Sequence, residues 1–303
     1  MPPAIPQQTI EWATRAIAPD AHLISTRALH GGTSTPIHRL RIETPTEQHD
    51  VVLRRVTNLE WYEREPDLLE REANALRLAT KHGLATPRLI ALDARARHAD
   101  VPALLMSHVA GHIEIAADAL ARNVQRIAEL LPHIHALPVR SNAFPPYQRY
   151  RTALDHVPAW SRKPDAWRAI IKYARRPAPT HRDVFIHRDF HPGNIMWSRG
   201  RVTAVIDWVN ASIGAPEVDL GHCRWNLVVL GGVRLADTLL ATYLDVMHTT
   251  KHEPYWDIRT LLDAGYLGYT DIAQWRANGL ADATPAQIRT RLDAYAVSLA
   301  ARI

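Results

Sequence analysis

The sequence contains a single cysteine, Cys223, among its 303 residues. One cysteine excludes an intrachain disulfide framework and favours a reducing compartment. The N-terminal segment MPPAIPQQTIEW lacks the basic start and the long apolar run of a signal peptide, and no later apolar stretch is long enough to span a bilayer. We therefore expect a cytoplasmic protein that has no membrane partner.

Internal repeats and low-complexity tracts are also lacking. Hydrophobic residues make up 47% of the chain and charged residues 22%, a balance typical of a globular protein and not of a disordered or fibrous one. At 303 residues the chain exceeds the usual size of one compact domain. We expect two lobes, each with its own core.

Positive charge is unevenly distributed. The net charge is +5, and residues 149–201 carry 12 basic and 4 acidic side chains, whereas residues 1–108 carry 13 of each. Basic residues interleaved with Trp160, Trp167 and Tyr173 are compatible with a nucleic-acid backbone. No recognised nucleic-acid motif accompanies them, so we interpret the segment as a solvated helical face and expect no nucleic-acid partner.

The first hundred residues alternate strand-like and helical signals. Turn-forming residues separate the short runs 36–42 and 51–56, which predicts an antiparallel strand pair. Residues 66–82 have a one-sided apolar stripe and end before Gly83, which is typical of a helix. Two further strands are predicted at 89–92 and 102–109, and we place a lobe boundary near residue 107.

Helical spacing dominates the rest of the chain. It covers 123–137, 165–175 and nearly everything after about residue 220, where Thr284 and Pro285 mark one helix start. The exception is a predicted β-hairpin, in which residues 195–197 and 202–206 flank the short turn Ser198-Arg199-Gly200-Arg201.

The most informative segment is HRDFHPGN at residues 187–194, followed by this hairpin and then by Asp207 at the end of the apolar run VTAVI. Phosphoryl transfer needs a divalent metal ion to neutralise phosphate charge and a carboxylate beside the attacking hydroxyl group. An Asp and an Asn on one loop, with a second Asp nearby, meet both needs. The hairpin would bring Asp207 back beside Asn194.

This order resembles the catalytic loop of kinases, which has an H-R-D start, an Asn five positions after the Asp, and a metal-binding Asp after a hairpin. The pattern H-x-D-x-H-P-x-N followed by I-D-W is similar, more closely, to the aminoglycoside phosphotransferase and choline kinase superfamily. The resemblance is specific over 187–219, looser from the Gly31 loop to about Asn226, and generic beyond.

The resemblance implies an α+β, protein-kinase-like bilobal fold. Residues 1–107 would form a small N-terminal nucleotide-binding lobe with an antiparallel sheet and one main helix. Residues 108–303 would form a larger, mostly helical C-terminal lobe that holds the catalytic and substrate-binding residues.

The same resemblance assigns roles within the motif. Asp189 would be the catalytic base or the carboxylate that positions the hydroxyl group, and Asn194 and Asp207 would be Mg²⁺ ligands. His187 would be a structural support. Asp219, in the sequence PEVDL, would be the buried aspartate that holds the catalytic loop from the next helix.

A phosphate-binding loop is expected before the first strand pair. Gly31 and Gly32 permit close approach of backbone to phosphate, and the hydroxyl of Ser34 can donate, although Gly-Gly alone is often an ordinary turn. Arg54 occupies the position where kinases carry a phosphate-contacting lysine, and its planar fork requires a different geometry. Arg55 would point to the other face of the strand, toward solvent.

Two further nucleotide-site positions follow from the predicted elements. Glu72 lies beside the apolar stripe of helix 66–82, so its buried carboxylate would need a cationic partner, for which Arg54 is the candidate. A surface pair with an arginine of the same helix is the alternative. Ser107 and Val109 would lie in the hinge between the lobes, where their backbone groups would bind the adenine.

The sequence therefore predicts an ATP- or GTP-dependent small-molecule kinase that uses Mg²⁺ and phosphorylates a hydroxyl group. Ten positions separate Asp207 from Glu217, too few for a long activation segment, which favours a small-molecule acceptor. The acceptor would be an aminoglycoside or other antibiotic, an amino alcohol or a sugar. Acidic residues after Asp207 suit a cationic acceptor or form an ordinary charged surface: Glu217, Asp237, Asp245, Asp257, Asp263 and Asp271. Oligomeric state has no signal in the sequence.

Two other functions stay open. His187, Asp189 and His191 are spaced as alternating metal ligands, which would suit a zinc or iron hydrolase. That hypothesis gives Asn194 and Asp207 no role. The chain could also be a nucleotide-binding relative that has lost catalysis.

Overall fold

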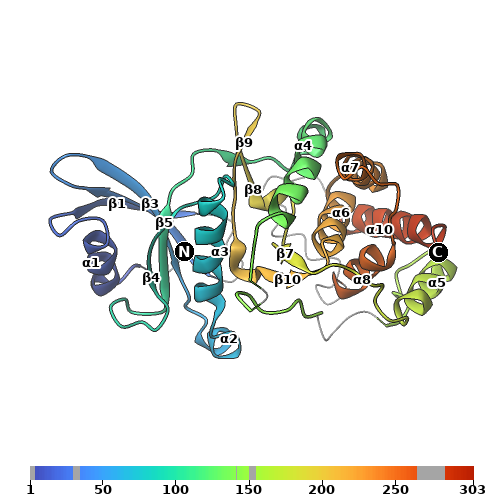
Figure 1. Ribbon diagram of the computed structural model, residues 1–303, viewed down its shortest axis with the longest axis horizontal. Coiled ribbons are helices and arrows are strands. Elements are labelled where there is room, and N and C mark those ends of the chain that lie inside the picture. Colours follow the sequence, from blue (N-terminus) through green and yellow to red (C-terminus); the bar gives the residue numbers. More distant parts are fainter. Residues whose placement is uncertain (1–3, 30–34, 141, 150–154, 265–283) are drawn as a thin grey trace. The chain divides into compact units, whose positions relative to one another are not determined.

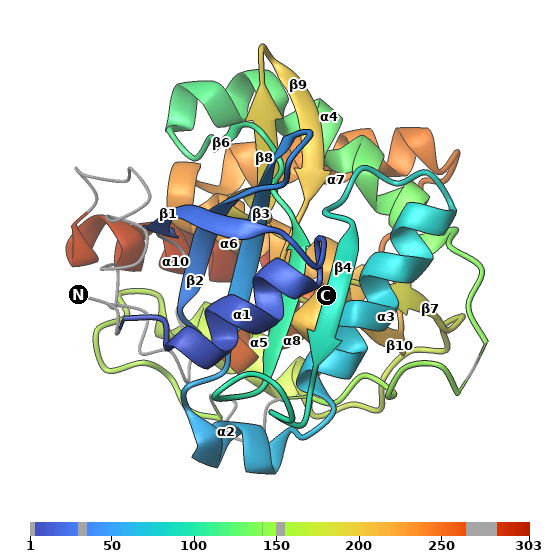
Figure 2. The same cartoon turned by 90° about the vertical axis from the view of Figure 1, so that its left-hand side faces the viewer.

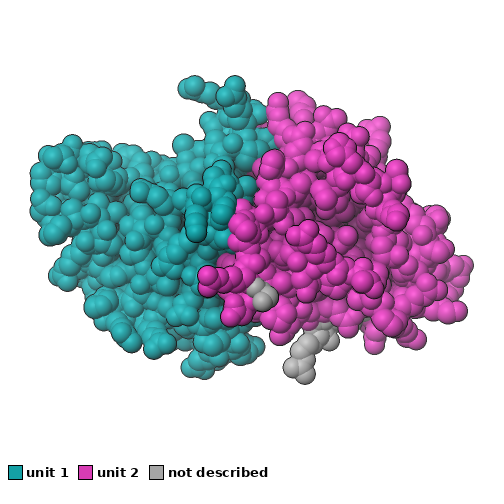
Figure 3. All heavy atoms as spheres, viewed as in Figure 1, with its two compact units in different colours: residues 1–112, 196–210 teal, residues 113–195, 211–303 magenta. Residues whose placement is uncertain are grey.

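A computed structural model describes residues 4–29, 35–140, 142–149, 155–264 and 284–303. The chain divides into two compact units, coloured separately in Figure 3. Unit 1 comprises Met1–His112 and Met196–Asn210, and unit 2 comprises Ile113–Ile195 and Ala211–Ile303. The division at His112 lies close to the boundary expected near residue 107. The second half of the chain nevertheless returns one segment, the predicted hairpin, to unit 1.

Unit 1 is built on a five-stranded sheet with the order β1-β2-β3-β5-β4, in which every neighbouring pair is antiparallel. The predicted pairing of 36–42 with 51–56 is confirmed, because Ile37 lies opposite Arg54 and Glu43 opposite Gln48. The strands are β1 (His22–Leu29), β2 (Ile37–Glu43), β3 (Gln48–Arg55), β4 (Leu89–Asp93) and β5 (Ala103–Ser107).

Side-chain alternation along β3 gives the sheet two different faces. Val51 and Leu53 are buried in a core beneath α1 (Gln7–Arg15), which lies across the near face of the sheet in Figure 2. Arg54 points to the other face, toward α3 (Leu68–Lys81). Arg55 was expected in solvent, and this is wrong: it is buried on the α1 side, because its guanidinium binds the carboxylate of Asp100.

The predicted helix 66–82 is α3. Its apolar stripe is buried, and Gly83 follows it with a φ of +74°, a left-handed conformation that ends a helix at little cost for glycine. A short helix, α2 (Leu59–Arg64), precedes it and is capped by the Asn58 side chain, which accepts from the Trp61 N–H.

The predicted hairpin consists of β8 (Ile195–Ser198) and β9 (Arg201–Val205). Arg199 and Gly200 both have positive φ, 51° and 70°, as a two-residue type I′ turn requires. With β6 (His112–Ile113) the hairpin forms a three-stranded sheet. The 3₁₀ turn η2 (Trp208–Asn210) follows, and the Trp208 indole donates to Thr86 Oγ1 just beyond α3.

Unit 2 is mainly helical (Figure 1). The helix α6 packs against α7 and α8, α4 against α7, and α5 against α10. Nearly all of α6 is buried, including its charged residues Asp219 and Arg224. The Thr284 capping box at the start of α10 confirms the predicted helix start. The helices are α4 (Ala117–His135), α5 (Pro164–Ala174), α6 (Glu217–Gly231), α7 (Val233–Val246), α8 (Tyr255–Asp263) and α10 (Pro285–Ala300).

A two-stranded antiparallel sheet lies among these helices and positions the motif. It pairs β7 (Val184–Ile186) with β10 (Ser212–Gly214), and Ile186 packs on Val218 and Trp256. The motif at 187–194 begins directly after β7 and ends in the 3₁₀ turn η1 (Pro192–Asn194). Within the described residues, every helix is too short or too polar to cross a membrane.

Candidate active site

Asp219 organises the loop formed by residues 187–194. Its side chain is fully buried at the start of α6, and its two oxygens accept the backbone N–H groups of His187, at 2.8 Å, and Arg188, at 2.6 Å. The His135 ring, from α4, lies 3.1 Å from the same carboxylate. These bonds hold Arg188 at a φ of +67°, a strained backbone conformation for a residue with a side chain.

Asp189 presents its carboxylate at the surface of unit 2, with 30% of the side chain exposed. Its Oδ1 lies 3.0 Å from Nε2 of His222 and 3.8 Å from Nε2 of His191. Asn194 Nδ2 donates to the Asp189 backbone oxygen, at 2.9 Å, and approaches Oδ2 at 3.4 Å. Asp189 and Asn194 are therefore held together, whereas His222 was not anticipated from the sequence.

The surroundings of Asp189 favour its ionised form. Burial tends to raise the pKa of its carboxyl group, but the hydrogen bond from His222 and the nearby His191 and His187 rings hold that pKa well below its usual range. At neutral pH the group is a carboxylate. It can therefore accept a hydrogen bond from a hydroxyl group.

His187 and His191 act as loop caps. Nδ1 of His187 accepts the Asp189 N–H, at 3.3 Å, and Nδ1 of His191 accepts the Gly193 N–H, at 3.0 Å. In the part of the chain that the structure describes, no cluster of three or more His, Cys, Asp or Glu side chains could hold a metal ion. The Nδ1 atoms of His187 and His191 are therefore engaged within their own loop.

Unit 1 contributes a second cluster, around Arg54. Its Nε lies 3.1 Å from Glu72 Oε2, its Nη2 donates to Asp207 Oδ1 at 3.0 Å, and its Nη1 donates to Thr35 Oγ1 at 3.3 Å. The exposed fractions of Arg54 and Glu72 are 4% and 1%. The expected partner of Glu72 is thus found. Asp207 itself has a φ of +66°, a second strained position.

Two carboxylates share the single guanidinium of Arg54. Burial raises the pKa of Glu72 to about 7; the charge of Arg54 opposes this shift and the charge of Asp207 adds to it. The Nε contact with Glu72 is close, but its geometry is not that of a hydrogen bond. The negative charge of Glu72 is therefore only partly neutralised by Arg54.

The structure says less about the other residues expected at the nucleotide site. The Ser107 N–H donates to the Arg88 carbonyl, and the Ser107 hydroxyl accepts the Arg88 N–H, each at 2.8 Å. Of the Ser107 backbone groups, its carbonyl is therefore the candidate to bind the adenine. Val109 follows β5 in an irregular segment. Gly31, Gly32 and Ser34 lie outside the described residues.

The oxygen donors present suit a magnesium ion. The Nδ2 of Asn194 is engaged by Asp189, which leaves its amide oxygen to face away, and Asp207 offers a partly exposed carboxylate. Mg²⁺ is usually bound through one or two such oxygens together with water and substrate phosphates, and not by a complete protein cage. The absence of a larger cluster among the described residues is compatible with this use.

The family model described as "Phosphotransferase enzyme family" matches residues 25–257 of the chain. The chain is a member of the phosphotransferase enzyme family. The match includes the catalytic loop, Asp207 and Asp219. A search of curated proteins found no match to the sequence of this chain.

Solved structures with the same fold include several phosphotransferases. LicA in complex with AMP has a TM-score of 0.60 at 16% identity, over 97% of this chain and 96% of its own. The aminoglycoside phosphotransferase APH(4)-Ia, with ADP and hygromycin B, has 0.57 at 14% over 92% and 95%. The macrolide 2′-phosphotransferase MphH of Brachybacterium faecium has 0.55 at 17% over 95% and 97%. The expected α+β, kinase-like fold is confirmed.

Proposed function

We propose that this phosphotransferase moves the γ-phosphoryl group of ATP to a hydroxyl group of a small molecule. The carrying observation is Asp189: an ionised, partly exposed carboxylate, fixed by His222 and Asn194 on a loop that Asp219 holds in a strained conformation. Such a group can orient a hydroxyl and receive its proton.

Adenine nucleotides in related structures favour ATP over GTP as the donor. APH(4)-Ia is bound to ADP, and LicA to AMP. In the proposed reaction the bond from the γ-phosphorus to the oxygen bridging it to the β-phosphate breaks. The acceptor oxygen bonds to the γ-phosphorus, ADP leaves, and the hydroxyl proton passes to Asp189 and then to solvent.

The proposal assigns Asn194 and Asp207 as the magnesium ligands; Asn194 precedes the hairpin β8–β9 in the chain and Asp207 follows it. Mg²⁺ would supply neutralisation of the phosphate charge. On the unit 1 side, Arg54 and the backbone at Ser107 and Val109 would contact the nucleotide, with Glu72 orienting Arg54.

The test compares D189N with D165N, which changes an exposed carboxylate on α5. With ATP, Mg²⁺ and a panel containing hygromycin B, a macrolide, an amino alcohol, a sugar and a hydroxy acid, D165N should retain transfer and D189N should lose it. Nucleotide binding by D189N, read as a rise in unfolding temperature, should stay near that of the unchanged protein. Saturation at about 100 times the dissociation constant adds roughly 2.7 kcal/mol and shifts unfolding by several degrees.

D207A completes the experiment, because it should remove the magnesium-dependent part of that shift. Turnover by D189N would refute the role of Asp189, and an unchanged shift in D207A would move the metal site elsewhere. A nucleotide shift with no transfer to any acceptor would favour the catalytically silent relative.

A further inference from the structure

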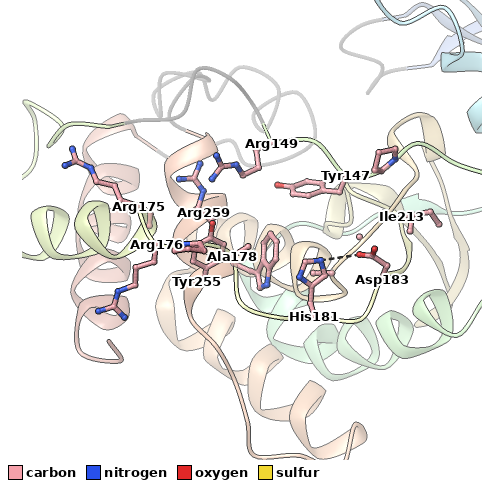
Figure 4. A pocket seen from close by; sticks show the side chains of 16 residues that line it. Tyr147, Arg149, Arg175, Arg176, Ala178, His181, Asp183, Ile213, Tyr255 and Arg259 are labelled. Atoms are coloured by element: carbon pink, nitrogen blue, oxygen red, sulfur yellow. Dashed lines mark ion pairs between the residues drawn. The ribbon is translucent and has the colours of Figure 1, made fainter. Parts of the chain in front are cut away.

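Unit 2 contains a hollow of about 730 Å³ with a basic wall (Figure 4). Its volume lies within the range of small-molecule sites, roughly 300–1,000 Å³. It lies among the segment around Tyr147, the end of α5, β10 and the first turns of α8. Among its described lining residues the acid is Asp183, which pairs with His181 at 3.2 Å. The lining arginines are Arg149, Arg175, Arg176 and Arg259.

Arg259 gives this wall an unsatisfied donor. The residue is 9% exposed, and its Nη2 donates to Asp263 at 2.8 Å. Its Nε is buried and, among the described residues, has no hydrogen-bond partner. A buried guanidinium N–H without an acceptor is costly, so the Arg259 guanidinium is only partly satisfied by Asp263.

Among the described residues, positive charge exceeds negative charge at this end of the hollow. Arg259, Arg149 and Arg188 all act on the carboxyl group of Asp263. Burial outweighs them and raises the pKa of Asp263. Figure 4 shows Arg149 and Arg259 extending into the same region, while Arg175 and Arg176 diverge at the α5 end.

Arg188 links the loop 187–194 to the wall of the hollow within unit 2. The Arg188 guanidinium lies 5.8 Å from the centroid of the Tyr147 ring, and its Nη2 donates to the Gln148 carbonyl at 2.9 Å. Arg188 immediately precedes Asp189 in the sequence. A ligand seated against Tyr147 would therefore lie beside a ring that contacts Arg188, the residue that precedes Asp189 in the sequence.

Acidic residues that might have favoured a cationic ligand are already engaged. Asp237 and Asp257 both bind the buried Arg224, and Asp263 binds Arg259. Asp257 and Asp263 are buried, so their charge is neutralised inside unit 2, whereas Asp237 is 38% exposed and also pairs with Arg302. Asp257 and Asp263 are therefore not available to a cationic ligand, and Asp237 is part of an ordinary charged surface.

We propose that this hollow binds an oxyanion, a carboxylate or a phosphate, carried by the acceptor. Arg149 and Arg259 hold the oxyanion, and Tyr147 and Trp256 contact the apolar part of the same molecule. This rests on the proposed function and names its substrate class: a hydroxyl compound with negative charge. Polycationic aminoglycosides would be poor acceptors.

The first arm of the test measures anion binding without nucleotide or magnesium. Inorganic phosphate and succinate are titrated at constant ionic strength, with tryptophan fluorescence and unfolding temperature as readouts. R149Q, at an exposed position, should weaken binding about tenfold, as expected for one charge-assisted pair. R122Q, which removes an exposed arginine of α4 outside the hollow, should match the unchanged protein.

The variant D263N should change anion binding in the opposite direction. It removes the buried counter-charge of Arg259 while keeping the side chain's shape, so anion binding should tighten several-fold. Circular dichroism checks that each variant is folded. Equal binding by R149Q and R122Q, or weaker binding by folded D263N, would overturn the oxyanion site.

The second arm compares acceptors in matched pairs, a hydroxy acid and its amide, with ATP and Mg²⁺. The acid should have the higher kcat/KM, and R149Q should reduce the preference about tenfold. Equal use of acid and amide would overturn the acceptor assignment. If the first arm succeeds and no phosphoryl transfer occurs at all, the proposed function fails and the acceptor assignment with it, while the oxyanion site stands.

Discussion

His222 determines which oxygen of Asp189 is available to a hydroxyl group. Its Nε2 lies 3.0 Å from Oδ1, whereas within the described residues Oδ2 has only the long contact of 3.4 Å with Asn194. A hydrogen bond at one oxygen restrains the rotation of the carboxylate and directs the other oxygen outward. His222 is thus a positioning residue for the proposed reaction.

Replacing His222 should therefore lower kcat more than it raises KM. We expect H222L to reduce kcat by about 10- to 100-fold, because Asp189 loses its orienting bond, and H222Q, whose amide can donate from a similar position, to recover much of the loss. Steady-state kinetics with a productive acceptor check this. Equal losses in H222L and H222Q, or a change confined to KM, would show that His222 serves the fold alone.

The sequence identifies the motif residues well and their supporting residues poorly. Asp219 and Asn194 are found because they belong to a continuous local pattern. His222 has a weak signal, three positions after Asp219 on one helix, where the two side chains share a face. His135 has none, since α4 brings it to Asp219 from 84 positions away.

At the scale of elements, segments with a clear pattern and end signals were predictable, and segments that lack them were not. The helix α3 and the hairpin β8–β9 carry both a pattern and end signals. β1 is an edge strand whose residues are mostly exposed, so it lacks alternating burial. β7 and β10 have three residues each, too few to show a period, and pair only because the helices of unit 2 enclose them.

The link between α3 and β3 makes unit 1 sensitive to pH. The folded state raises the pKa of Glu72 from 4.5 to about 7, so between these values it holds a proton that the unfolded chain has released. The free energy of unfolding should therefore fall as pH rises from about 4.5 to 7, by up to roughly 3 kcal/mol.

Urea unfolding at pH 5 and pH 7 measures this dependence against E72Q. The amide does not titrate, so E72Q should lose less stability than the unchanged protein between the two pH values, and the difference isolates Glu72 from the histidines. Identical pH dependence in both proteins would mean that Arg54 keeps Glu72 ionised throughout.

For the whole molecule, the segment that the family model matches is shorter than the folded structure. The family match ends at residue 257, yet α10, beyond it, is part of the core of unit 2. Asp293 of α10 accepts from the Ser161 hydroxyl, the Arg162 N–H and the Trp167 indole. The sequence predicts α10 as a helix from its cap, but not these bonds, because their donors lie about 130 positions earlier.

Unit 2 is further held together by a buried charge that joins four helices. Arg224 of α6, with no exposed surface, binds Asp257 of α8 and donates to Asp237 of α7 at 2.8 Å. Tyr295 of α10 donates to Asp257 at 3.1 Å. Burial would raise the pKa of Asp257, but Arg224, His252 and Tyr295 hold it below its usual range, so Asp257 stays ionised and needs its partner.

R224M should therefore destabilise the protein by about 3–5 kcal/mol, because it leaves the Asp257 carboxylate buried without its cation. R302Q is the matched control: Arg302 binds the same Asp237, also at 2.8 Å, but is partly exposed, and its loss should cost less than about 1 kcal/mol. Thermal and urea unfolding of the two variants measure the contrast. If R224M lay within about 1 kcal/mol of R302Q, methionine packing would replace the ion pair, and the charge cluster would not be what joins these helices.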